Sequence, residues 1–354
     1  MKTFGLRLVA LVRVRKRFEC KELQVLQVNK PLDYLGMEVS KSIKDGQEVL
    51  SLTMSAYSKK MVEFMELDGK HHSMKPVECP YKDKMTELAD DDELLSYTER
   101  KKFMTGIGML GWLVSCIRGD LAYTYSMIAS CMARPTKMAM RRLVWATRYI
   151  KGTSTYRGVT DEKMNTQTSQ WRHFSDSDQG KDQSSTNKGK SRCGQISLAN
   201  GFPVYFKFKA TSVAMAHPDI GEGHADVSSA ACEIYAAAQS TFALLYLSYC
   251  AEEMGIAFEK PSVLEMDNHA SEVFTNNSAI STKLRHIDQR QHWVKTLRDK
   301  NIIRAKHVGT KKNIADIFTK PLEGEAFRSI RDMFLHDCTD ICVQGGISML
   351  EPME

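Results

Sequence analysis

The spacing of hydrophobic and polar residues predicts a small β-hairpin followed by helices in the first half of the chain. Alternation predicts two strands, at 35–39 and 49–53, around an Asp45-Gly46 turn. Apolar residues recurring every three to four positions then predict helices at 55–65, 97–117 and 136–150. The first half is therefore expected to combine a few strands with several helices.

The second half follows a different pattern, in which strands and helices alternate. Three strands are expected in succession, at 171–175, 193–199 and 202–208. The elements expected after them are a helix at 228–253, a strand at 262–266, a helix at 283–299, a strand at 302–308 and a helix at 313–320. Pro321 should end the last helix, because proline cannot continue it. This alternation predicts a mixed α/β fold.

A polar segment at 152–192, rich in Ser, Lys and Asp, separates the two halves. The chain has 354 residues, enough for about two domains of roughly 150 residues each. We therefore expect one unit at 1–160, a second at 168–340 and a tail at 341–354.

Composition narrows the possible classes of protein. Hydrophobic residues make up 42% of the chain, enough for substantial cores, and no apolar run approaches the roughly 20 residues of a membrane span. The apolar residues at 6–14 are interrupted by Arg7 and Arg13, which does not fit a signal peptide. The nine scattered cysteines indicate free thiols in a reducing compartment. A cytoplasmic protein without membrane contact is expected.

The net charge of +6 suits a polyanionic partner without requiring one. Cations crowd one C-terminal stretch, which consists of Arg285, Arg290, Lys295, Arg298, Lys300, Arg304, Lys306, Lys311 and Lys312. Such a stretch either contacts phosphates or forms a solvated helix face.

Acidic residues stand at the ends of the expected elements: Asp176 and Asp178, Glu233, Asp267 and Asp316. Strand ends and helix starts at one edge of a sheet converge, so these carboxylates can form a cluster. Asn313 is expected to cap the helix of Asp316, and Ser228 or Ser229 that of Glu233. Clustered carboxylates repel one another unless cations lie among them, and oxygen ligands suit Mg²⁺ or Mn²⁺. The alternative is that each acid is a solvated turn or cap.

Six short motifs in the second half resemble, in order, those of the ribonuclease H domain of copia-type retrotransposon Pol polyproteins. They are Phe-Ser-Asp-Ser-Asp at 174–178, Ser-Arg-Cys-Gly at 191–194, the Ser-Ser and Glu-Ile-Tyr-Ala pair within 228–236, Asp-Asn at 267–268, Arg-His-Ile-Asp with a later histidine at 285–292, and Ala-Asp-Ile-Phe-Thr-Lys at 315–320. The last is the most distinctive. The resemblance implies a ribonuclease H-like mixed sheet flanked by helices.

The first half resembles the end of the reverse transcriptase of the same polyproteins. The motifs that carry the likeness lie at 34–39, 106–112, 120–123 and 148–153, in the thumb and connection. The Tyr-x-Asp-Asp turn of the polymerase should precede Tyr34, where nothing fits it. We therefore expect a truncated reverse-transcriptase remnant, smaller and largely helical, without reverse-transcriptase activity.

The resemblance also implies a site and a reaction. The four metal ligands of the family fall on Asp176, Glu233, Asp267 and Asp316, holding two Mg²⁺ or Mn²⁺ ions, and Asp178 becomes a supporting neighbour. The expected activity is hydrolysis of the RNA strand of RNA/DNA hybrids. Contacts to nucleic acid are expected from Arg285, His286, His292, Lys311, Lys312 and Lys320.

Other interpretations stay open. The family usually has tryptophan where Gln179 and Phe206 stand, an acid where Ala231 stands, and no counterpart of residues 217–226. These departures favour a decayed or domesticated nucleic-acid-binding module that keeps the fold without cleavage. An integrase-like polynucleotidyl transferase shares the carboxylate logic but lacks the motif at 315–320. Expected partners include other parts of the polyprotein, and expected locations extend to a virus-like particle or the nucleus.

Overall fold

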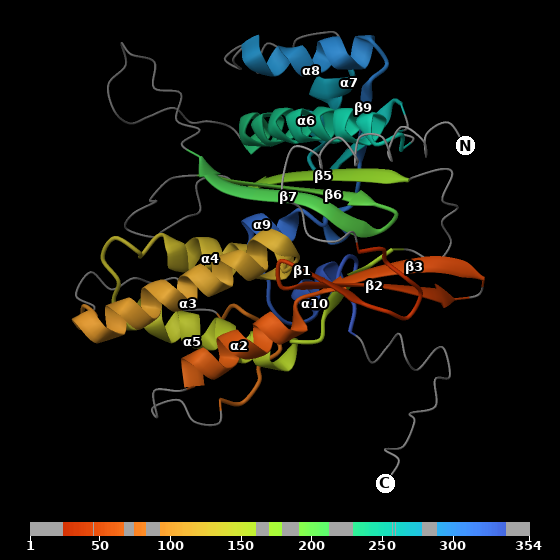
Figure 1. Ribbon diagram of the computed structural model, residues 1–354. Helices are drawn as coiled ribbons and strands as arrows, with labels where there is room; N and C mark the ends of the chain where they lie inside the picture. The colour runs from red at the N-terminus through yellow and green to blue at the C-terminus, as the bar shows by residue number, and fades with distance from the viewer. Residues whose placement is uncertain are drawn as a thin grey trace, which may run out of the picture.

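The computed structural model describes residues 24–44, 46–66, 74–82, 93–160, 170–178, 191–211, 229–256, 258, 260–277 and 289–337. Two sheets organise these residues. A small antiparallel sheet lies beside the helices of the first part, and a larger mixed sheet belongs to the second part (Figure 1).

The small sheet has the order β1-β2-β3-β4. Its strands are β1 (Leu32–Tyr34), β2 (Met37–Lys44), β3 (Gln47–Thr53) and β4 (Arg157–Val159). The predicted hairpin is present, but β2 begins at Met37 rather than at residue 35. Leu35 and Gly36 form the turn from β1 instead, with φ angles of +56° and +79°. β4 was not predicted, and it returns from the end of the first part to pair with β3.

The helices of the first part are α2 (Ser55–Glu66), α3 (Tyr97–Cys116), α4 (Ala122–Ala129) and α5 (Lys137–Gly152), with a 3₁₀ turn at Gly119–Leu121. Three of them match predicted helices. A capping box fixes the start of α3, because Ser96 and Glu99 each accept a hydrogen bond from the backbone of the other. Thr136 caps α5 by accepting from the backbone N–H of Ala139.

The large sheet has the order β7-β6-β5-β8-β9. Its strands are β5 (Trp171–Asp178), β6 (Ser191–Ala199), β7 (Phe202–Thr211), β8 (Ser262–Met266) and β9 (Ile303–His307). The pairs β5–β6 and β6–β7 are antiparallel, whereas β8 is parallel to both β5 and β9. All five strands were predicted, with shifted bounds for four of them. The mixed α/β fold expected from the sequence is confirmed.

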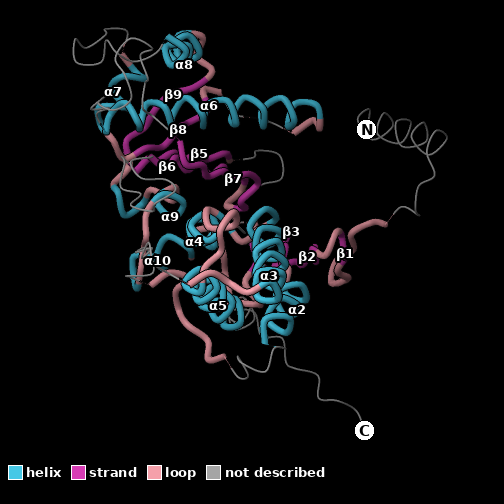
Figure 2. The backbone as a smooth tube through the Cα atoms, turned by 90° about the vertical axis from the view of Figure 1, so that its left-hand side faces the viewer, coloured by secondary structure: helices cyan, strands magenta, loops and turns pink. Residues whose placement is uncertain are grey.

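Helices cover both faces of this sheet. The helices of the second part are α6 (Ser229–Glu253), α7 (His269–Asn276), α8 (Gln289–Asp299), α9 (Asp316–Thr319) and α10 (Gly324–Arg331). α6 lies along one face, and α9 lies against the other, next to α4 (Figures 1 and 2). The helix predicted at 313–320 is a single turn, and residues 283–288 of another predicted helix lie outside the described residues. No described helix is long and apolar enough to span a membrane.

One hydrophobic core runs through both parts of the chain. Phe103 and Leu110 of α3 belong to the same buried cluster as Phe174 of β5 and Phe318 of α9. α10 returns to the first part, where Phe327 meets the ring of Tyr149 edge-on at 5.7 Å between centroids. A smaller set of contacts joins α6 to β8, β9, α7 and α8. The division at 160–168 stays a prediction, and the segment after Pro321 packs with the first part.

Candidate functional site

Three acidic side chains meet at one edge of the large sheet. Asp176 lies near the end of β5, and Asp267 directly follows β8. The parallel register pairs Phe174 with Glu265, so two residues further on it places Asp176 beside Asp267. Glu233 reaches them from the start of α6. One carboxylate oxygen from each of Asp176, Glu233 and Asp267 lies within 4.8 Å of the others.

Asp316 lies beside this group but is held by a lysine. It is the first residue of α9, and the Nζ atom of Lys320 lies 2.8 Å from its Oδ1 atom. The same Nζ is 3.2 Å from Oδ1 of Asp176. The structure pairs the ammonium of Lys320 with two of the predicted metal ligands, and its predicted contact with nucleic acid stays a prediction. Among the described acids, the group within 4.8 Å holds three of the four predicted ligands, without Asp316.

Neutral side chains fix the orientation of the acids. The hydroxyl of Thr319 donates to Oδ2 of Asp176. The buried amide of Asn313 donates to Oδ1 of Asp267 at 3.3 Å and to the carbonyl of Ser175 at 3.1 Å. Asn313 was expected to cap α9, but the helix begins after Ala315 without a side-chain cap. The amide instead joins β5 to the loop after β8.

Sequence reasoning did not assign these supporting roles. Thr319 lies within the Ala-Asp-x-x-Thr-Lys motif, three residues after Asp316, so its spacing was a usable signal. His307 ends β9 and places Nε2 3.1 Å from the backbone oxygen of Asp267. No motif marked His307, because its position depends on the pairing of β8 with β9.

Burial and mutual repulsion raise the pKa values of the clustered acids, so the cluster should bind a proton or a cation readily. Burial first, and then the carboxylate of Asp316, raise the pKa of Asp176 to about 7, although Lys320 and Thr319 oppose the shift. Burial, followed by Asp176 and Asp267, raises the pKa of Glu233 to about 9. The pKa of Asp316 is also raised, mainly by burial. Each shift reflects the cost of a negative charge that lacks enough cations nearby.

The residues present fit a hard divalent cation. All donor atoms are carboxylate oxygens, which Mg²⁺ and Mn²⁺ prefer. The Oε2 atom of Glu233 is buried and has no hydrogen-bond partner among the described residues. A buried carboxylate oxygen of this kind is normally satisfied by a donor or a cation.

The other predicted site residues are spread more widely. Asp178 is buried at the end of β5 and lies outside the group of three acids. Lys311 and Lys312 are exposed in a 3₁₀ turn before α9. Arg285 and His286 lie outside the described residues, and the side chain of His292 on α8 is not described either. The roles assigned to all of them stay predictions.

The basic C-terminal stretch is only partly a solvated face. Lys295 is 8% exposed, and its Nζ atom lies 4.2 Å from the centroid of the Phe274 ring. The guanidinium of Arg298 donates to the backbone oxygen of Thr275 at 3.1 Å. Both cations thus hold α8 against α7 and are less available to a phosphate.

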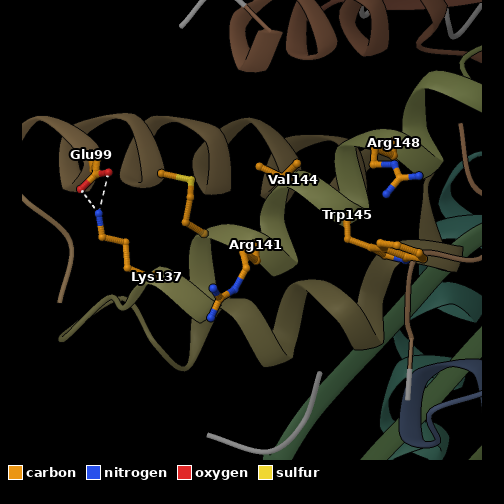
Figure 3. Close-up of a pocket in the computed structure, with 7 residues that line it drawn as sticks. Glu99, Lys137, Arg141, Val144, Trp145 and Arg148 are labelled. Atoms are coloured by element: carbon orange, nitrogen blue, oxygen red, sulfur yellow. Dashed lines mark hydrogen bonds and ion pairs between the residues drawn. The ribbon is translucent and has the colours of Figure 1, made fainter. Parts of the chain in front are cut away.

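A cavity of about 390 Å³ lies along α5 and the start of α3, and its lining includes none of the clustered acids. Figure 3 shows the Glu99–Lys137 ion pair at one end and Trp145 beside Arg148 at the other. The acid among its lining residues is already neutralised, since Nζ of Lys137 lies 2.8 Å from Glu99. Its lining offers no group of carboxylates for a cation, so the chemistry is assigned to the cluster of Asp176, Glu233 and Asp267.

Comparison with known proteins identifies relatives among transposon proteins. The sequence is 21% identical over 234 residues to the retrovirus-related Pol polyprotein from transposon TNT 1-94 of Nicotiana tabacum, covering 65% of this chain and 16% of that protein. It is 24% identical over 235 residues to the Pol polyprotein from transposon RE1 of Arabidopsis thaliana, covering 66% and 15%. The chain is a homologue of retrotransposon Pol polyproteins. This confirms the copia-type resemblance seen in the motifs.

The chain spans about a sixth of the length of these Pol polyproteins. No protein-family model matches the sequence. The activities and partners of a complete Pol polyprotein therefore come to this chain only as proposals.

Solved ribonuclease H structures also align with the chain. LC11-RNase H1, in complex with an RNA/DNA hybrid, is 13% identical, covers 42% of this chain and 94% of its own, and gives a TM-score of 0.29. The N-terminal RNase H domain of a Mycobacterium tuberculosis protein is 13% identical, covers 46% and 98%, and gives 0.29. The large mixed sheet, with helices on both faces, is the ribonuclease H-like arrangement expected from the sequence.

Proposed function

We propose that the chain is a ribonuclease H-type endonuclease that hydrolyses the RNA strand of RNA/DNA hybrids with two Mg²⁺ or Mn²⁺ ions. One observation carries the proposal: Asp176, Glu233 and Asp267 come from three separate elements and place carboxylate oxygens within 4.8 Å of one another. The relationship to Pol polyproteins supports the same activity, because their ribonuclease H domain carries the motifs that hold these acids.

Asp176, Glu233 and Asp267 would hold the cations, with Asp316 as the fourth ligand. The bound ions would supply an activated water and would stabilise the leaving oxygen during attack on the phosphodiester. Within the chain, Asn313 orients the Asp267 carboxylate and Thr319 orients that of Asp176. Burial of Asp176 and Glu233 excludes bulk water, which strengthens every charge interaction at the site.

Lys320 has a separate task in this arrangement. Its ammonium joins Asp176 to Asp316 and so holds α9 against the end of β5. It also removes part of the repulsion between these two buried acids, which otherwise disfavours their ionised forms. Lys320 therefore keeps Asp316 within reach of the other three carboxylates.

A second candidate function is a nucleic-acid-binding module without cleavage. The observation that favours it is again Lys320, because its ammonium already occupies both Oδ1 atoms, of Asp176 and of Asp316. The basic surface residues would still bind phosphates in such a protein.

Incubation of the full chain with end-labelled RNA/DNA hybrid, RNA duplex and DNA duplex separates the two functions. The nuclease should cut only the RNA strand of the hybrid, in the presence of Mg²⁺ or Mn²⁺, and a chelator should abolish the cut. Hybrid binding without a cut under either ion would reject the nuclease and favour the binding module. Cutting that persists in chelator would reject the metal site.

A further inference from the structure

A small cavity of about 60 Å³ lies on the flank of the large sheet, between β6, β7 and α6. Five polar residues contribute to its lining: Gln195, Lys207, Lys209, Tyr235 and Gln239. Tyr235 follows the proposed ligand Glu233 by two residues along α6. Gly194, which also lines the cavity, is the cross-strand partner of the proposed ligand Asp176, so the cavity lies one strand away from the acidic cluster.

The strand register places the polar groups of the cavity on one face of the sheet. Ser175 pairs with Gln195, and Gln195 pairs with Lys207. Cross-strand partners share a face, and residues two apart on a strand share it as well, so Lys209 lies beside Lys207. β7 is the edge strand, about 10 Å from β5 at ~4.8 Å per strand. Both lysines therefore lie on a strand about 10 Å from β5, a distance that corresponds to roughly three base-pair steps of a duplex at ~3.4 Å per step.

The two lysines are available to an external anion. Both are exposed, and neither forms an ion pair with another described residue. A lysine ammonium donates up to three hydrogen bonds and accepts none, which suits the phosphate oxygens of a nucleic-acid backbone. Phosphate contacts position a strand without reading its sequence, so these lysines alone would not distinguish RNA from DNA.

Gln195 provides the group that makes this distinction. Gln195 is 7% exposed and lines the cavity, and its Oε1 atom has no hydrogen-bond partner among the described residues. A buried acceptor without a donor is costly, so the geometry favours a donor that enters from the cavity. The ribose 2′-hydroxyl is a donor that RNA carries and DNA lacks.

We propose that the cavity is a subsite for the RNA strand, in which Lys207 and Lys209 bind backbone phosphates and Gln195 accepts a hydrogen bond from a ribose 2′-hydroxyl. The inference rests on the proposed function and deepens it, because it assigns a strand and a specificity residue to the flank of the site.

Gln195→Met tests the specificity residue, since methionine has a similar volume and lacks the amide. Binding of the full chain to RNA/DNA hybrid and to DNA duplex is measured by fluorescence anisotropy in chelator. The hybrid affinity should fall about 3- to 10-fold, the effect of one hydrogen bond, with DNA affinity unchanged. The melting temperature should hold or rise, because an unpartnered polar group has been replaced by an apolar one. Equal effects on both duplexes, or none, would overturn the assignment.

The double variant Lys207→Gln and Lys209→Gln tests the phosphate contacts through salt dependence. The slope of log affinity against log salt should become shallower by about two units for the hybrid, near one unit per lost contact. The matched control, Lys59→Gln with Lys60→Gln on the exposed face of α2, removes the same charge and should leave the slope unchanged. Equal slopes for both double variants would exclude the subsite. Because binding is read without cleavage, failure of hydrolysis and failure of the subsite give different results.

Discussion

Replacing Asp267 with asparagine removes one negative charge from the acidic cluster and nearly preserves the shape of the side chain. The variant can still accept the hydrogen bond from Asn313, which reaches Oδ1 of Asp267 at 3.3 Å in the native protein. Loss of a charged ligand should abolish divalent-ion chemistry. We expect hybrid cleavage to fall at least about 100-fold, equivalent to roughly 3 kcal/mol of transition-state stabilisation.

The Asp267→Asn substitution should make the metal-free protein more stable than the native one at alkaline pH. Two unit charges 4.8 Å apart repel by about 3 kcal/mol at an effective dielectric constant of roughly 20. This repulsion helps to raise the pKa of Glu233 to about 9 from its usual 4.5, behind burial and Asp176. A raised carboxyl pKa destabilises the folded state as pH rises above 4.5, because the unfolded chain releases the proton and the folded chain keeps it.

Asp267→Asn should therefore stabilise the metal-free chain at pH 8 by on the order of 1–3 kcal/mol, or a few degrees in melting temperature. At pH 4 the two proteins should melt alike, since Asp176 and Glu233, whose pKa values are raised to about 7 and about 9, are then protonated and carry no charge to repel residue 267. Thermal melts in chelator at both pH values, with hybrid cleavage in Mg²⁺, provide the measurements. The matched control, Asp33→Asn, removes an exposed charge in the first part and should change neither. Near-native cleavage by Asp267→Asn would remove Asp267 from the site, and a variant that unfolds would make it structural.

Three further experiments test other parts of the chain. Burial lowers the pKa of His173 to about 3, so the free energy of unfolding does not depend on this group above about pH 6.5 and decreases as pH falls from 6.5 towards 3. In His173→Phe this decrease should be smaller by about 1.4 kcal/mol per pH unit, as measured by urea denaturation. Gly194→Ala would place a Cβ atom 2.7 Å from Cβ of Phe318, so it should cost about 1–3 kcal/mol, whereas Gly108→Ala meets open space and should be neutral or stabilising by thermal melting. The full chain should extend no primer on any template, and incorporation above background would contradict the expectation that the sequence before Tyr34 holds no Tyr-x-Asp-Asp turn.

The sequence predicted the convergence of the acids better than their neutralisation. Asp176 and Asp267 each follow a run of strand-forming residues, and parallel strands bring their ends to one edge of a sheet. The pairing of Lys320 with Asp176 could not be predicted in this way, because it depends on α9 lying against β5. The close approach of α9 is possible because Gly194 has no side chain facing Phe318.

Short helices were missed for local reasons. α7 begins immediately after Asp267, where Asn268 accepts from the backbone N–H of Ser271, and this residue pair was interpreted only as a site motif. α10 follows Pro321 and has only a few apolar positions, among them Phe327 and Ile330, so its spacing gave a weak signal. Its burial depends on contacts with the first part, which are distant in sequence.

Because α3, α9 and α10 share one core with β5, each half of the chain should depend on the other for stable folding. A backbone cut between residues 160 and 170 would leave both pieces held together by Phe103, Phe318 and Phe334, which are all fully buried. Two separately produced fragments ending and beginning at this cut should therefore reassemble when mixed, as in split-protein complementation. Asp316 would then be delivered to the acidic cluster through reassociation, so cleavage itself would report that the halves had met.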